Sequence, residues 1–120
     1  MKGYMGKLLR VNLTEKSIEV ESLPEDYARD FIGGSGLGVR LAYDEIPPET
    51  EPLSPQNRLI FMTGPVTATS LSTAGRYQVI FKLLLTGILC DSSSGGHWRS
   101  ALRMAGYDGL IIEGAATSPA

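Results

Sequence analysis

Glycine constrains this chain more than any other residue type, because it makes up 14 of the 120 residues and is clustered. Proteins average about 7% glycine. Four glycines fall within residues 33–38, and Gly95 and Gly96 close a run of three serines. Clustered glycine marks backbone that needs unusual dihedral angles or that must approach something closely. Both clusters are therefore candidates for a tight corner or a binding site.

Hydrophobic periodicity around the clusters predicts an α+β fold, with an N-terminal hairpin and mixed β-sheets joined by a few short helices. The order does not alternate regularly between strand and helix, which argues against a doubly wound sheet. Residues 47–57 hold four of the seven prolines and are expected to form a surface loop, and residues 67–73 a polar one. Alternating apolar residues predict strands over 9–13, 17–21, 59–62, 77–84 and 110–112, and helical spacing predicts helices over 24–32, 37–46 and 98–105.

The first glycine cluster does not match a dinucleotide-binding loop. The G-x-G-x-x-G pattern placed on Gly34 and Gly36 requires glycine where Val39 stands, and a helix is expected before the cluster instead of a strand. Two interpretations are left. The cluster is either a corner between two helices, where small residues allow close packing, or a loop kept small so that a flat ligand can approach.

The second cluster closes the run at residues 91–96, just before an expected helix. Successive backbone N–H groups, hydroxyls and a helix N-terminus together favour a phosphate or other anion. The alternative is that the serines only cap the helix. Arg76, which opens the strongest predicted strand, is a solvated residue on the simpler interpretation and a phosphate partner if the anion site exists.

The composition excludes several classes of function. With 11 Lys+Arg against 13 Asp+Glu, the formal net charge of −2 argues against nucleic-acid binding driven by overall charge. One cysteine, Cys90, and one histidine, His97, exclude an internal disulfide and a Cys/His zinc site. We expect Cys90 to be a small buried hydrophobe and His97 a surface or capping residue. Because no signal peptide or membrane span is visible, we expect a cytoplasmic protein without membrane contact.

An ordered set of segments covering essentially the whole chain resembles one family, the tungsten-containing aldehyde ferredoxin oxidoreductases. No single segment is decisive, but their order and spacing are specific. The segments are YMGKLLRVNLT (4–14), FIGGSGLG (31–38), PLSPQN (52–57), GPVT (64–67), GRY (75–77), DSSSGG (91–96) and AGYDGLIIEG (105–114).

The resemblance implies that residues 1–120 are the N-terminal domain that cradles a tungsten bis-pterin cofactor. Arg76 matches the family arginine near a pterin phosphate, and Gly95, with Gly96 beside it, matches a glycine whose backbone lies against the cofactor. Ser93 falls where the family commonly has an asparagine whose backbone carbonyl helps hold the magnesium that bridges the pterin phosphates. Because the backbone supplies that contact, serine is compatible with it. The cysteines of the family's 4Fe-4S cluster lie in later domains, which agrees with the single Cys90.

The implied reaction of the full-length enzyme is oxidation of an aldehyde to a carboxylic acid, with electrons passed through the cluster to ferredoxin in anaerobic metabolism. We expect residues 1–120 alone to be inactive, and to expose apolar surface where later domains of the same chain dock. The resemblance also allows a homodimer, and the residues do not distinguish tungsten from molybdenum. The rival interpretation is a free-standing, non-catalytic module that binds a phosphate-bearing ligand.

Overall fold

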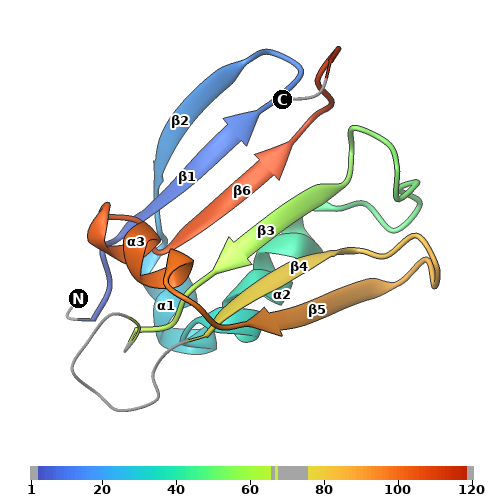
Figure 1. The fold of residues 1–120 in the computed structure, drawn as a ribbon. Coiled ribbons are helices and arrows are strands. Elements are labelled where there is room, and N and C mark those ends of the chain that lie inside the picture. The colour runs from blue at the N-terminus through green and yellow to red at the C-terminus, as the bar shows by residue number, and fades with distance from the viewer. Residues whose placement is uncertain (1–2, 66, 68–75, 119–120) are drawn as a thin grey trace.

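The chain folds into one six-stranded mixed sheet with α1 and α2 on one face and the short α3 on the other side (Figure 1). A computed structural model describes residues 3–65, 67 and 76–118. The strand order is β2-β1-β6-β3-β4-β5, in which β1 and β6 are parallel and the other neighbours antiparallel. This confirms the α+β prediction, with a single sheet in the described residues. The elements are β1 (Lys7–Asn12), β2 (Ser17–Ser22), α1 (Glu25–Phe31), α2 (Gly34–Glu45), β3 (Arg58–Met62), β4 (Tyr77–Lys82), β5 (Leu89–Ser94), α3 (Trp98–Met104) and β6 (Gly109–Glu113).

The N-terminal hairpin follows the predicted alternation. Strands β1 and β2 pair from Lys7 with Ser22 to Asn12 with Ser17. The turn is stabilised by the Asn12 side chain, whose Oδ1 accepts a hydrogen bond of 3.1 Å from the Glu15 N–H. Lys16 takes a left-handed conformation with φ of 54°. Apart from Thr67, the polar loop expected over residues 67–73 lies outside the described residues.

The prediction for residues 91–94 was wrong, because they form a strand and not a loop before a helix. Asp91 to Ser94 belong to β5, and β5 pairs with β4 from Leu89 opposite Lys82 to Ser94 opposite Tyr77. Serine has little preference for strands, but β4 is strongly strand-forming and supplies a complete pairing partner, which overrides local preference. The serines therefore do not cap α3. Position 97 precedes that helix, and His97 makes no side-chain capping bond there.

The hydrophobic core lies between the sheet and α2. Helix α2 packs against β3 and β4, and the buried apolar residues form one cluster with it. Its members are Leu8, Leu23, Ala28, Leu37, Leu41, Ala42, Ile60, Met62, Ile80 and Ile111. Cys90, predicted to be buried, is only half-buried because it lies on β5 at the edge of the sheet. Among the described residues, no helix has the length and apolar character needed to cross a membrane.

The first glycine cluster is the helix corner of the simpler interpretation. Helix α2 begins at Gly34, three residues before the predicted start, and Gly38 lies directly on the sheet. A Cβ atom at Gly38 would be 2.2 Å from Cδ1 of Ile80, and one at Gly36 would be 2.8 Å from the carbonyl oxygen of Phe31. The corner itself is a γ-turn at Ile32, with φ of 68° and ψ of −69°, closed by a 2.8 Å bond from the Gly33 N–H to the Phe31 carbonyl. Glycine therefore sets how closely the helices and sheet approach.

Charged residues fill the sheet face beyond the C-terminal end of α2. Arg10 on β1 donates to Glu45 at 2.6 Å and to Glu21, and Arg58 pairs with Glu113 at 3.2 Å. The hydrogen bond to Glu45 is the main cause that raises the pKa of Arg10 above its ordinary value. This cluster joins β1, β2, β3 and β6 to the last turn of α2 at the end of the sheet away from the glycines.

Substituting Gly38→Ala is expected to lower the free energy of unfolding. The added methyl group would force Ile80 to move, at a cost of about 1–3 kcal/mol, which exceeds the roughly 1 kcal/mol that alanine gains over glycine in a helix. Ser35→Ala, in the same helix, is the control and should change stability by less than about 0.5 kcal/mol. Guanidinium chloride unfolding of both variants checks this. A Gly38→Ala protein as stable as wild type would contradict the packing argument.

Candidate functional site

The residues singled out in the sequence meet at one end of the sheet, where β4 begins and β5 ends (Figure 1). Tyr77 pairs with Ser94, so Arg76 and Gly95 lie immediately beyond that pair, one on each strand. Ser93 pairs with Gln78, and its hydroxyl donates a 2.8 Å hydrogen bond to the Gln78 Oε1. The pairing of β4 with β5 thus brings Arg76 close to Ser93, Gly95 and Gly96, which lie up to 20 positions away in the chain.

These positions are open to solvent. Arg76, Ser93, Gly95 and Gly96 are all exposed. Gly96 has φ of 96°, a conformation that favours glycine, and no atom lies within 4 Å of where its Cβ would be. Strand β5 is also an edge strand, so part of its backbone N–H and C=O groups face away from the sheet. Backbone groups at this end are therefore accessible to a ligand.

The first glycine cluster lies against the same end of the sheet. A Cβ atom on Gly34 would be 3.4 Å from Cγ of Gln78, and one on Gly33 would be 3.0 Å from the Thr63 carbonyl oxygen. Helix α2, which has 12 residues, therefore begins beside the Gln78–Ser93 pair. The positive end of its dipole favours negative charge at this location. The first glycine cluster, which forms the corner between the helices, and the second, which is the candidate anion site, thus lie in one region.

Sequence reasoning missed Gln78 and the contact between the two glycine clusters. Gln78 is a polar residue within the apolar run of β4, on the face that elsewhere carries the buried Ile80. A polar residue at a position that the alternation assigns to the buried face was the sequence signal that pointed to Gln78. The meeting of residues 33–34 with residues 93–96 depends on long-range pairing, and no local spacing indicates it.

A second arginine adds positive charge near this end. Arg99 lies in the first turn of α3, next to Trp98, whose ring centroid is 4.9 Å from that of Tyr77. The Arg99 Nε is buried and has no hydrogen-bond partner among the described residues. An exposed arginine, a helix N-terminus and an open glycine backbone together suit a phosphate.

The described part of the chain offers no cage of side chains for a metal ion. No group of three or more His, Cys, Asp or Glu side chains there is placed to hold a metal ion.

A buried ion pair fixes the elements around the site. The Asp108 carboxylate accepts hydrogen bonds from the Arg103 Nη1 at 2.6 Å, from the Met5 N–H at 2.9 Å and from the Gly6 N–H at 2.8 Å. Arg103 is 4% exposed and Asp108 2%. The Asp108 carbonyl accepts from the Thr63 N–H and hydroxyl, and the Thr63 carbonyl accepts from Gly34. The N-terminal segment, α3, β3 and the start of α2 are thereby joined.

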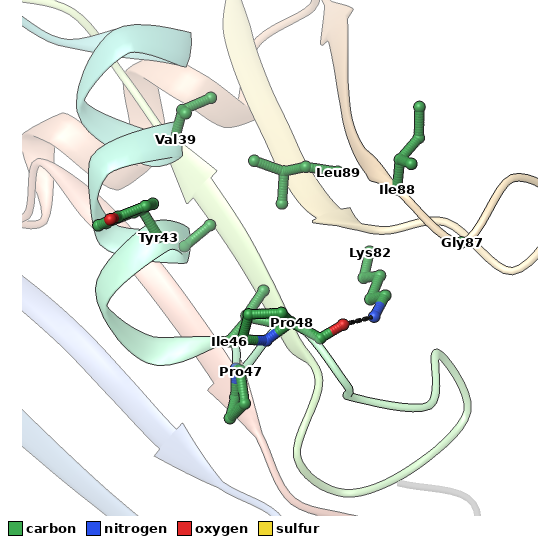
Figure 2. A pocket seen from close by; sticks show the side chains of 10 residues that line it. Val39, Tyr43, Ile46, Pro47, Pro48, Lys82, Gly87, Ile88 and Leu89 are labelled. Atoms are coloured by element: carbon green, nitrogen blue, oxygen red, sulfur yellow. Dashed lines mark hydrogen bonds between the residues drawn. The ribbon is translucent and has the colours of Figure 1, made fainter.

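A groove of about 540 Å³ lies at the opposite end of β4 and β5. It runs between the C-terminal half of α2 and the turn after β4 (Figure 2). Its lining is mostly apolar, and the Lys82 Nζ is occupied by a 2.6 Å hydrogen bond to the Pro48 carbonyl. Among the described residues that line the groove, none is Asp, Glu, His or Cys. Its lining residues are Val39, Ala42, Tyr43, Ile46, Pro47, Pro48, Lys82, Gly87, Ile88 and Leu89.

Comparison with known proteins gives one consistent result. The sequence model of the family described as "Aldehyde ferredoxin oxidoreductase, N-terminal domain" matches residues 8–120. A tungsten-containing aldehyde ferredoxin oxidoreductase of Pyrococcus abyssi is 47% identical over 119 residues, which are 99% of this chain and 20% of that protein. The WOR-like subunit of an aliphatic sulfonate oxidoreductase of Pyrococcus furiosus is 34% identical over 122 residues, covering 99% of this chain and 19% of that protein.

A solved structure has the same fold. The active site complex BamBC of benzoyl coenzyme A reductase, in complex with 1,5-dienoyl-CoA, superposes with a TM-score of 0.95 and 33% identity over 98% of this chain and 18% of that one. This chain thus spans about a fifth of the length of the proteins it resembles.

Replacing Asp108 is expected to be strongly destabilising. Asp108→Ala leaves the Arg103 charge buried and two backbone N–H groups without an acceptor, a loss of about 3–5 kcal/mol. Asp108→Asn keeps the shape and one acceptor oxygen and should lose less. Asp44→Ala is the control, because Asp44 pairs with Arg40 at 3.4 Å and accepts a hydrogen bond of 2.6 Å from the Tyr27 hydroxyl, both at the surface. Surface ion pairs contribute about 1 kcal/mol or less. Urea unfolding measures all three. Equal losses for Asp108→Ala and Asp44→Ala would contradict the anchoring role.

Proposed function

The chain belongs to the aldehyde ferredoxin oxidoreductase N-terminal domain family, and we propose that it forms the cradle for a tungsten bis-pterin cofactor in a larger oxidoreductase. The observation that carries the proposal is the convergence of Arg76, Gly95 and Gly96 with the N-terminus of α2 at one end of the sheet. Pterin phosphates are anions, and this end offers donors and positive charge for them.

Each residue has a distinct part in the proposed cradle. The Arg76 guanidinium binds a pterin phosphate through charge-assisted hydrogen bonds. Gly95 and Gly96 let the backbone approach the cofactor, because no side chain intervenes. The backbone carbonyl of Ser93 would be a ligand of the cofactor's magnesium ion, while its hydroxyl stays bonded to Gln78. Arg99, with its unpartnered Nε, supplies further positive charge beside α3.

The proposed reaction of the full-length protein is oxidation of an aldehyde and water to a carboxylic acid, releasing two electrons and two protons. The tungsten centre supplies that two-electron chemistry when bound, and the protein supplies binding, orientation and electrostatics. Ferredoxin would be the electron acceptor, and a 4Fe-4S cluster held by later domains of the same chain would supply the electron-transfer chemistry. We place this enzyme in the cytoplasm and in anaerobic metabolism.

The named relatives support a role for this domain in holding the cofactor, and not in selecting the substrate. Proteins described as aldehyde, aliphatic sulfonate and benzoyl coenzyme A enzymes resemble almost the whole of this chain at 33–47% identity. What they have in common over these residues is therefore independent of the substrate. The substrate pocket and the groups that move protons belong to the rest of the protein.

Variants of the cradle in the full-length protein test this proposal. A charge-assisted hydrogen bond contributes roughly 1.5–3 kcal/mol, so Arg76→Ala should weaken cofactor retention by about ten- to a hundredfold. Arg76→Lys should recover only part of this, because an ammonium group lacks the bidentate geometry. Gly95→Val should also reduce retention, whereas Ser93→Asn should have little effect because the proposed contact uses the carbonyl. Tungsten and pterin content per protein are measured for each variant.

The matched control is Lys16→Ala, which removes an exposed positive charge from the turn between β1 and β2. It should leave tungsten and pterin content unchanged. If Arg76→Ala and Gly95→Val also leave both unchanged, this end of the sheet does not bind the cofactor.

A further inference from the structure

We infer that Gln78 is a positioning residue of the proposed cradle: its neutral side chain holds Ser93 against the start of α2 and leaves the positive charge there for a phosphate. The inference rests on the proposed function, because it names a further residue of the same site. It depends on where Gln78 lies, on the hydrogen bond that it accepts and on the type of side chain that stands there.

Gln78 occupies a position on β4 that packing alone would fill with an apolar side chain. It lies two residues before Ile80, so both side chains are on the sheet face that α2 covers. Ile80 is fully buried beneath Gly38. Gln78 lies in the same way beneath the first turn of α2, because a Cβ atom on Gly34 would be 3.4 Å from its Cγ. A polar group next to the core needs a hydrogen-bond partner, and the side chain of Ser93 provides it.

The hydrogen bond between Ser93 and Gln78 ties the end of β5 to the start of α2. The Ser93 hydroxyl donates to the Gln78 Oε1 at 2.8 Å, and the two residues are also opposite each other in the register of β4 and β5. Arg76 and Gly95 lie just beyond the next pair of the same strands. A shift of Ser93 relative to α2 would therefore move the backbone that the cofactor is proposed to contact.

The choice of glutamine points to a bound anion, because the fold by itself favours glutamate here. A glutamate would have the same shape, would accept the Ser93 hydroxyl more strongly and would place a negative charge at the positive end of the α2 dipole. Helix α1 has such an arrangement, with Glu25 and Asp26 in its first turn. Among residues 34–37, the first turn of α2, none is acidic. The neutral amide of Gln78 keeps this positive end available to a ligand.

An acid on the same sheet face does not take the place of a glutamate at position 78. Asp91 lies on β5 opposite Ile80, two residues farther from the cradle along the strand than Ser93. It shares a hollow with Arg40, whose positive charge opposes its own.

The test compares two substitutions of Gln78 in the full-length protein. Gln78→Glu keeps the shape and the acceptor for Ser93 but adds a negative charge. Gln78→Leu fills a similar space and removes the hydrogen bond without adding charge. Gln56→Glu is the matched control, because it adds the same charge in the exposed loop before β3, at the end of that strand away from the cradle. Tungsten and pterin content per protein are measured for each variant, and circular dichroism shows that each is folded.

We expect Gln78→Glu to lower cofactor retention at least about tenfold, because like charges brought together repel strongly. Gln78→Leu should lower it only about threefold, through the loss of one neutral hydrogen bond, and Gln56→Glu should leave it unchanged. Equal losses in the two Gln78 variants would overturn the inference, because charge would then play no part. If Arg76→Ala loses cofactor and Gln78→Glu retains it, the inference fails and the proposed function stands. If both variants retain it, both fail.

Discussion

The buried carboxylate of Asp108 holds together the end of the molecule on which the rest of the fold depends. It accepts hydrogen bonds from Arg103 of α3 and from the backbone of the N-terminal segment, more than 100 residues away along the chain. This contact brings β6 beside β1 in parallel, a pairing that requires a long crossover connection. Through its carbonyl, Asp108 also binds Thr63, and Thr63 binds Gly34 at the start of α2. One buried group thus orients both the sheet and the helix next to the candidate site.

Most of the elements could be predicted because their signals are local. Alternation gave the hairpin, and proline with glycine marked the boundaries of α1 and α2. Strand β5 could not be predicted in the same way, because its serines form a strand only by pairing with β4. The ion pair of Arg103 and Asp108 also has no local signature, since each residue alone resembles a surface charge. Local pattern and the resemblance to a known family both made Arg76 and the glycines candidates, but the structure alone places α2 against Gln78 beside them.

The polar end, where β4 begins and β5 ends, combines positive charge with accessible backbone and suits an anionic ligand. Proteins named for aldehyde, sulfonate and benzoyl coenzyme A chemistry resemble almost the whole of this chain. The proposed cradle would then be common to them, and the parts that contact their different substrates would lie elsewhere.

The central claim is that the polar end holds the phosphates of a tungsten–pterin cofactor. The most direct measurement is an experimental structure of the full-length protein isolated with its metal, with tungsten located by anomalous scattering. The account predicts a cofactor phosphate within hydrogen-bonding distance of the Arg76 guanidinium, and the backbone of Gly95 and Gly96 against the cofactor. A cofactor bound away from this end, with Arg76 in contact only with solvent or protein, would contradict it.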